Sequence, residues 1–432
     1  MTPKEVAALD GRLDRFLADL TASLGRSERH RWAKVYLQGL LLEGARKSIE
    51  PLAGRIEGAD VQSLRQFVGQ SPWAVEPIQQ ELAEKVVDLL AEPEVWMIDE
   101  TSFPKAGDAS VGVARQYCGA LGKIANCQVA VSLHWSTCEA SCPLGWRLYL
   151  PQSWLETPAR RAAGKIPDDI VYRNKNQLAL ELVDQMLKWD LPRLPVVADS
   201  AYGNDYDFRA GLRERGLQYA VAVEPTTKVW TTDPAQTPVA ASKPLGRPRQ
   251  YAALKDLPEA KTLAEAAREL PKQAWKHITW RQGTKGPMRS RFAQVKVWAA
   301  HGWNRNEHPK RVMEWLLIEW PEDAAAPSDY WPAQLGEQSL GLRRLAKIAH
   351  ARWRVEMDYR ELKKELGLDH YEGRHWLGWH HHVTLVSMAF AFLRGEQAQA
   401  KKNFWCDVDN AAPDSSAAAS EADSPRGTMP VV

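Results

Sequence analysis

The stretch Val196-Val-Ala-Asp-Ser-Ala-Tyr-Gly203 decides the fold of this 432-residue chain. Its first three residues are apolar and predict a short buried strand that ends at the carboxylate of Asp199. A second stretch upstream, Glu94-Val-Trp-Met-Ile-Asp99-Glu-Thr101, has the same form and delivers Asp99. We therefore expect two strands that each carry one aspartate to the same part of the molecule.

The surrounding residues, 91–223, predict an α/β core. Apolar segments at 95–99, 116–120 and 127–134 predict strands, the last two joined as a hairpin. Helical periodicity follows at 176–189, and further strands are expected at 194–198 and 217–223. Three strands, then helix, strand, helix and strand is the RNase H-like order, in which the first and fourth strands are neighbours. This order would bring Asp99 and Asp199 together.

A third carboxylate is expected on a helix near the C-terminal end of the core, residues 339–400. Residues 341–366 contain no proline, and at ~100° per residue four polar side chains fall within about 80° of one another. These are Arg352, Glu356, Arg360 and Lys363. Asp358 and Glu361 point away from that face, which favours Glu356. By itself the pattern also fits an ordinary helix with Arg–Glu pairs; the two aspartates decide for a site.

Residues 224–338 differ in composition and predict a β-rich insertion outside the α/β sheet. Between Lys243 and Arg311 there are 16 Lys or Arg and 5 Asp or Glu, in a chain of formal net charge +2. This indicates a polyanionic partner or a solvated basic face. Arg247 and Arg249 lie in a Gly-Arg-Pro-Arg segment that can enter a DNA minor groove. The same segment is also compatible with a proline-containing linker that makes no DNA contact.

The two ends of the chain have other characters. Residues 1–90 show helical spacing and predict either a DNA-binding domain or a packed helical cap, with Arg46 and Lys47 as candidate DNA contacts. Residues 401–432 are rich in Ala, Ser, Asp and Pro towards their end, and we expect a disordered tail.

Several classes of protein are disfavoured. The five cysteines form no disulfide or zinc framework, since the spacing of Cys138 and Cys142 is wrong and a second pair is missing. His380, His381 and His382 cannot all face one ligand from a helix. The sequence has neither a signal-peptide pattern at its start nor an apolar run long enough to cross a membrane. These features predict a protein of the reducing cytoplasm.

Taken together, three blocks resemble bacterial insertion-sequence transposases of the DDE type, in the RNase H-like superfamily. They are Trp96–Lys105 with Ser110–Gly119, then Val197–Gly203, then Arg352-Trp-Arg-Val-Glu356 followed by Lys363. The resemblance is to the subgroup that has a β-rich insertion before the catalytic glutamate and an Arg-Glu-Lys helix signature. The tyrosine position of that signature is Ala349 here, so the sequence departs from the signature where the resemblance implies a phosphate contact.

This resemblance implies a function and its site. Asp99, Asp199 and Glu356 would be catalytic and would bind two Mg²⁺ ions, for which Mn²⁺ can substitute, with Asp99 bridging them. DNA phosphates would contact Arg352, Lys363 and Arg360. The expected activity is cleavage and strand transfer at transposon ends, in a homodimeric complex with end and target DNA at the bacterial nucleoid.

The resembled subgroup also cuts the second strand through a DNA hairpin, which needs a base flipped out of the stack. Trp275, Trp280 and Trp298 of the insertion could stack on such a base, with Trp280 and Trp298 favoured. They could equally be core residues of the insertion. Two other functions stay open: a degenerate or domesticated relative that binds DNA without cutting it, and a host RNase H-like nuclease.

Overall fold

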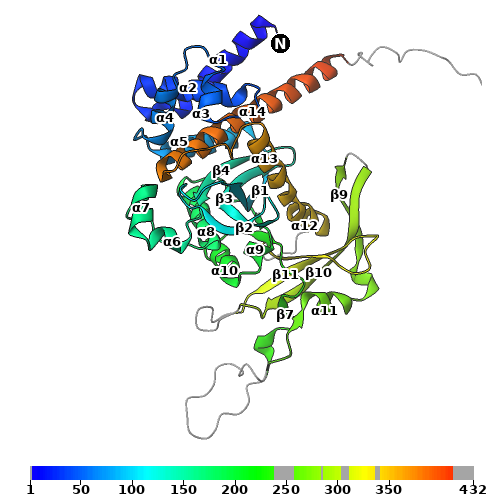
Figure 1. Cartoon of the computed structure of the whole chain (residues 1–432). Helices are drawn as coiled ribbons and strands as arrows, with labels where there is room; N and C mark the ends of the chain where they lie inside the picture. Colours follow the sequence, from blue (N-terminus) through cyan, green and yellow to red (C-terminus); the bar gives the residue numbers. More distant parts are fainter. Residues whose placement is uncertain (1, 238–256, 284–285, 303–310, 336–340, 412–432) are drawn as a thin grey trace, which may run out of the picture.

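The computed structural model describes residues 2–237, 257–283, 286–302, 311–335 and 341–411. A group of helices lies at one end of the molecule, a mixed sheet with flanking helices forms the middle, and long strands of the insertion extend from the other end (Figure 1). Helices combined with one large mixed sheet confirm the expected α/β class with an N-terminal helical part and a β-rich insertion.

The N-terminal residues form helices that pack around the last long helix of the chain, α14 (Trp376–Ala411) (Figure 1). Helix α1 begins after Thr2, whose side chain and that of Glu5 cap each other's backbone, and it buries Leu13, Leu17 and Leu20. The helices are α1 (Pro3–Leu20), α2 (Ser27–Leu41), α3 (Ile49–Ala53), α4 (Val61–Gly69) and α5 (Val75–Leu89).

The central sheet contains the strands that carry the two aspartates. Its core strands are β1 (Pro93–Pro104), β2 (Ala114–Cys118), β3 (Lys123–Thr137), β4 (Ser141–Leu148), β5 (Val196–Ala198) and β6 (Tyr219–Val221). Strand β1 pairs with β5 in parallel, with Trp96 opposite Val196 and Met97 opposite Val197. The expected neighbourhood of these two strands is therefore confirmed.

The core contains one strand that the sequence did not predict. Strand β4 pairs with β3 and is almost fully buried, although its sequence, Ser-Cys-Pro-Leu-Gly-Trp-Arg-Leu, contains Pro and Gly. Burial on both faces removes the polar–apolar alternation that marks a strand, and Pro143 and Gly145 resemble a turn. A register shift falls between Leu133 and His134 of β3, opposite Pro143 and Gly145, so an irregularity accommodates these two residues.

Helices cover this part of the sheet and connect its strands. Helix α8 follows closely the predicted span and contacts β3 and β4, whereas α9 and α10 follow β5. Their bounds are α6 (Gln152–Leu155), α7 (Pro158–Gly164), α8 (Lys175–Lys188), α9 (Ser200–Gly203) and α10 (Tyr206–Glu214).

The insertion continues the core sheet, which corrects the expectation that it lies outside that sheet. Strand β12 pairs with β6, placing Ala333 opposite Ala220 and Gln334 opposite Tyr219. The order across the described strands is β2-β3-β1-β5-β6-β12-β11-β10-β7-β8, with β9 beside β10. The insertion elements are β7 (Lys228–Trp230), β8 (Lys261–Thr262), α11 (Leu263–Arg268), β9 (Lys276–Gly283), β10 (Gly286–Ala299), β11 (Met313–Trp320) and β12 (Asp329–Gln334).

A buried polar cluster joins the insertion to the core. Glu314 of β11 accepts hydrogen bonds from Arg209 of α10 over 2.9 Å and from the Tyr219 hydroxyl of β6 over 2.5 Å. Arg213 lies 3.6 Å from the same carboxylate. Burial opposes the charge of Glu314, but the two arginines outweigh it and lower its pKa. The insertion and the core thus share a charged centre as well as a sheet.

The chain returns to the core through α12 (Leu342–Ala349), the 3₁₀ turn η5 (His350–Arg352) and α13 (Trp353–Lys364). The expected single helix over 341–366 is therefore interrupted at His350–Arg352. Helix α14 continues to Ala411, so the tail does not begin at residue 401 as expected; residues 412–432 lie outside the described part. Among the described helices, none combines the length and apolarity needed to cross a membrane.

Candidate active site

Asp99 lies in the middle of β1 and is only 6% exposed. Its neighbour in the antiparallel pairing is Ser132 of β3. Glu100, the next residue, forms an ion pair with Lys175 of α8, 2.6 Å away, and so engages a different partner from Asp99. The alternation of side chains along a strand therefore separates the two carboxylates.

Asp199 follows β5 directly and lies beside Asp99. Both aspartates are two residues beyond the paired positions Met97 and Val197, on strands that run in parallel. Asp199 caps α9, because its Oδ1 atom accepts a hydrogen bond from the backbone of Ala201 over 3.0 Å. Burial raises the pKa of Asp99 to about 7; Arg352 opposes this rise and the negative charge of Asp199 adds to it.

Arg352 connects the strand to the helix that carries the third candidate carboxylate. Its Nη1 atom donates to Oδ2 of Asp99 over 2.8 Å, and its Nη2 atom donates to Oε1 of Glu356 over 2.9 Å. The side chain of Glu356 is 63% exposed. One guanidinium therefore lies between the buried aspartate and the exposed glutamate.

Lys363 of α13 contacts β1 three residues after Asp99. It donates from Nζ to the backbone oxygen of Ser102 over 2.8 Å and lies over the Phe103 ring. Burial lowers its pKa. Arg352 thus reaches β1 at Asp99 itself, and Lys363 reaches it three residues later, at Ser102. Arg360, on the same helix, is exposed and touches the sulfur of Met357.

A family model of DDE superfamily endonucleases matches residues 19–287, which is more than half of the chain. The chain belongs to the DDE superfamily endonucleases. The matched segment contains Asp99 and Asp199 and ends before Glu356. The chain is also 31% identical over 188 residues to a probable transposase for insertion sequence element IS701 from Microchaete diplosiphon. That match covers 43% of this chain and 46% of the relative, so it spans about half of each.

The fit of the candidate site to a metal can be tested on its residues, since endonucleases of this superfamily generally depend on divalent metal ions. Asp99 and Asp199 offer hard oxygen ligands, and the raised pKa of Asp99 marks a buried negative charge that a cation would relieve. Glu356 does not join them, because Arg352 holds its carboxylate. Within the described residues, no three His, Cys, Asp or Glu side chains are grouped to hold a metal ion.

A buried polar chain behind the candidate site was missed by sequence reasoning. The Tyr359 hydroxyl lies 2.7 Å from Ser132 Oγ, His134 Nε2 lies 2.9 Å from the same atom, and His134 Nδ1 lies 2.8 Å from Asp358. This chain ties α13 to the strand beside Asp99. Asp358 does point away from the polar face, as expected, but it points into the protein. Its spacing from Val355 and Leu362 was the available signal, since those neighbours are buried.

The candidate DNA contacts fall in several places. Arg46 is exposed and pairs with Glu372 over 2.7 Å. Lys47 is 3% exposed and donates to the backbone oxygens of Leu40 and Leu42. Its ammonium group is therefore buried, which contradicts the expectation that it contacts DNA. Arg247 and Arg249 lie outside the described residues.

The two favoured tryptophans of the insertion are both half-buried. Trp280 stacks on His350 with ring centroids 4.3 Å apart. Trp298 is the register partner of Trp230 at the junction of β10 and β7. Trp275 packs edge-on against Trp320. The three consecutive histidines of α14 each contact a different partner.

Proposed function

We propose that this chain is an insertion-sequence transposase that cleaves DNA at the ends of its element and transfers the cut strands to target DNA. The observation that carries the proposal is the meeting of Asp99 and Asp199, on parallel β1 and β5, beneath a helix that presents Arg352 and Glu356. Membership of the DDE endonucleases and the partial likeness to a probable IS701 transposase support it.

Asp99 and Asp199 would hold divalent cations, two Mg²⁺ ions or Mn²⁺ in their place, and Glu356 would complete the ligand set after leaving Arg352. When bound, such ions make a water or 3′-hydroxyl nucleophilic and stabilise the leaving oxygen. Burial of Asp99 fits this role, because a carboxylate removed from water binds a cation without competition from bulk solvent.

The cations of the η5 turn and of α13 would hold the DNA beside the aspartates. Arg352 can exchange its two carboxylate partners for a phosphate, which suits the fork geometry of a guanidinium. Lys363, fixed against β1 near Ser102, would act as a point charge, with the exposed Arg360 as a further contact. Ala349 is buried at the end of α12, so the tyrosine contact of the resembled signature has no counterpart at that position.

Cleavage of both strands at an end would pass through a hairpin, with Trp280 or Trp298 stacking on the displaced base. Trp280 and Trp298 both belong to the insertion, and each is half-buried, so part of each side chain remains exposed. Two copies of the chain would act together, one on each end of the element, in the bacterial nucleoid.

The test is cleavage of a labelled duplex that contains the inverted repeat flanking the gene, with Mg²⁺ and purified protein. We expect cuts at the repeat boundary, followed by joining to a target plasmid, and loss of both with Asp99→Asn. Specific binding without cleavage would replace the proposal with a degenerate DNA-binding relative. Cleavage without preference for the repeat, or of RNA–DNA hybrids, would replace it with a host nuclease.

A further inference from the structure

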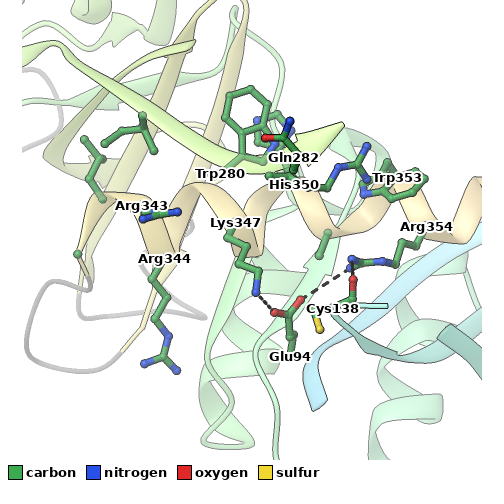
Figure 2. A pocket seen from close by; sticks show the side chains of 15 residues that line it. Glu94, Cys138, Trp280, Gln282, Arg343, Arg344, Lys347, His350, Trp353 and Arg354 are labelled. Atoms are coloured by element: carbon green, nitrogen blue, oxygen red, sulfur yellow. Dashed lines mark hydrogen bonds and ion pairs between the residues drawn. The ribbon is translucent and has the colours of Figure 1, made fainter. Parts of the chain in front are cut away.

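A groove of about 830 Å³ lies where the insertion meets the catalytic helix, between β9 and the segment from α12 to the start of α13 (Figure 2). We call it the seam groove. Five cationic side chains and one carboxylate line it: Arg281, Arg343, Arg344, Lys347, Arg354 and Glu94. The imbalance is large for a single groove and indicates an anionic occupant.

Two of the cations have structural partners within the groove. Glu94, at the start of β1, pairs with Lys347 of α12 and lies 3.7 Å from Arg354 of α13 (Figure 2). Arg354 also donates to the backbone oxygen of Cys138, beyond the end of β3. These contacts fasten α12 and α13 to the sheet, and they consume the one carboxylate of the groove.

The remaining cations have no carboxylate partner in the part of the chain that the structure describes. Arg343 and Arg344 are exposed on α12 and form no ion pair with any described residue, whereas Leu345, Ala346 and Ile348 of the same helix are buried. Figure 2 shows Arg343, Arg344 and Lys347 along the same stretch of α12. Helix α12 therefore packs on its apolar side and presents its charge outwards.

Aromatic rings from both walls also line the groove. Trp280 of β9 stacks on His350 with an interplanar angle of 7°, and Arg281 lies 4.0 Å above the ring of Trp353. Trp353 is 40% exposed, which is unusual for so large an apolar side chain. Flat rings among unneutralised arginines form a surface that suits nucleic acid better than an acidic peptide, because both bases and phosphates find partners on it.

We propose that the seam groove binds the backbone of the same DNA whose scissile phosphate lies at Asp99 and Asp199, as a second contact remote from the cut. This inference rests on the proposed function, since that makes DNA the substrate. Glu94 precedes Asp99 by five residues on β1, which is roughly 16 Å along a strand. That length equals about five base-pair steps of B-DNA, so one duplex can reach both places.

The experiment compares two double variants, each in an Asp99→Asn background that binds DNA without cutting it. Arg343→Ala with Arg344→Ala removes two exposed charges from the groove. Arg268→Ala with Lys272→Ala removes two exposed charges from the insertion outside the groove. Binding to the repeat-containing duplex is measured by fluorescence anisotropy over a range of salt concentrations, and melting curves check that both variants are folded.

We expect the slope of log affinity against log salt to become shallower by about 1.8 in the groove variant, that is ~0.9 for each lost phosphate contact, and to stay unchanged in the control. Hydroxyl-radical footprinting should lose protection about five base pairs from the cut. An unchanged slope in the groove variant would show that the seam groove does not bind DNA. The same conclusion follows if poly-glutamate competes with the labelled duplex as well as unlabelled DNA does. Either result would leave the proposed function intact. If the groove variant shows the shallower slope but the protein with Asp99 intact never cleaves the duplex, the seam groove stands as a DNA contact and the proposed function is rejected.

Discussion

Arg352 donates a hydrogen bond to Asp99 over 2.8 Å, and this pair joins the helix α13 to the middle of β1. The aspartate is buried, so the guanidinium is the nearest positive charge that offsets it. The contact has two consequences. It fixes the helix over the two aspartates, and it keeps Glu356 on the solvent side of Arg352.

Neutral substitution of the three carboxylates should separate binding from chemistry. Asp99→Asn, Asp199→Asn and Glu356→Gln are each expected to reduce Mg²⁺-dependent end cleavage by more than the ~10–100-fold that loss of an outer-shell metal partner costs. Binding to the transposon ends should persist, because these carboxylates serve the chemical step at the reacting phosphate, whereas other residues hold the DNA. Cleavage rates and gel-shift affinities check both parts, with Asp358→Asn as a buried acidic control on the same helix. Full cleavage by any one variant would remove that residue from the site.

Lys363 and its neighbour Lys364 form a matched pair for phosphate contact. Lys363 is held against β1, whereas Lys364 is exposed at the end of α13. Lys363→Ala should make the slope of log affinity against log salt shallower by about 0.9, and Lys364→Ala should leave it as it is. Binding titrations at several salt concentrations measure this. Equal slopes in the two variants would exclude Lys363 from the DNA interface.

Glu314→Gln tests the buried connection between insertion and core. It leaves Arg209 and Arg213 without a buried counter-charge, so we expect a loss of about 3–5 kcal/mol in the free energy of unfolding. Glu322→Gln removes a surface pair with Arg289 and should cost less than ~1 kcal/mol. Urea denaturation of the two variants compares them directly. Similar losses would mean that the cluster around Glu314 does not stabilise the fold.

His382 predicts a dependence of stability on pH. It is fully buried and neutral, since the Tyr36 hydroxyl can donate to Nδ1 and Nε2 can donate to the backbone of Leu368. Burial lowers its pKa to about 4 from an ordinary value of 6.5. The unfolded chain therefore binds a proton first as pH falls, and stability declines from pH 6.5 down to about 4.

Between pH 7 and pH 5 this decline should amount to roughly 2 kcal/mol from His382 alone. Denaturation curves across that range measure it. Burial lowers the pKa of the neighbouring His380 to about 3 and that of His381 to about 4, so these residues contribute in the same direction. His382→Gln should therefore reduce the dependence without abolishing it, whereas His277→Gln, at an exposed histidine of β9, should leave it as in the wild type. If both variants show the wild-type dependence, another group is responsible.

The hairpin route predicts a distinct product. Denaturing gels of end-labelled substrate should show a slow, double-length strand before open ends appear. Loss of a stacking ring removes ~1–3 kcal/mol per base, so Trp280→Ala or Trp298→Ala should reduce this product. Trp320→Ala, a half-buried tryptophan of β11, is the control. The hairpin route would be excluded if only open double-strand breaks appear throughout the time course and both Trp280→Ala and Trp298→Ala cleave normally.

The core of the site could be predicted from local sequence because its signals are local. Two apolar segments that each end in an aspartate define β1 and β5, and knowledge of the strand order places them side by side. The face of α13 follows from helical spacing. Arg352 and Glu356 are four residues apart and do form a pair.

The remainder depends on contacts between distant residues. Nothing near Tyr219 or Gln334 indicates that β6 and β12 would pair, since their separation in sequence exceeds one hundred residues. Lys47 carries a charge that predicts exposure, but the carbonyls of Leu40 and Leu42 make its burial tolerable. The polar chain through His134 required the packing of α13 on β3 to be known.

The pairing of β12 with β6 also bears on how such proteins can diversify. A segment that enters and leaves a fold through loops can be exchanged between relatives as a cassette. Here, excision of the insertion would leave β6 as an unpaired edge that could pair with other chains. It would also leave the buried Arg209 without its ion-pair partner Glu314. Exchange between homologous chains should therefore succeed only when β6, α10 and the insertion are transferred as one unit.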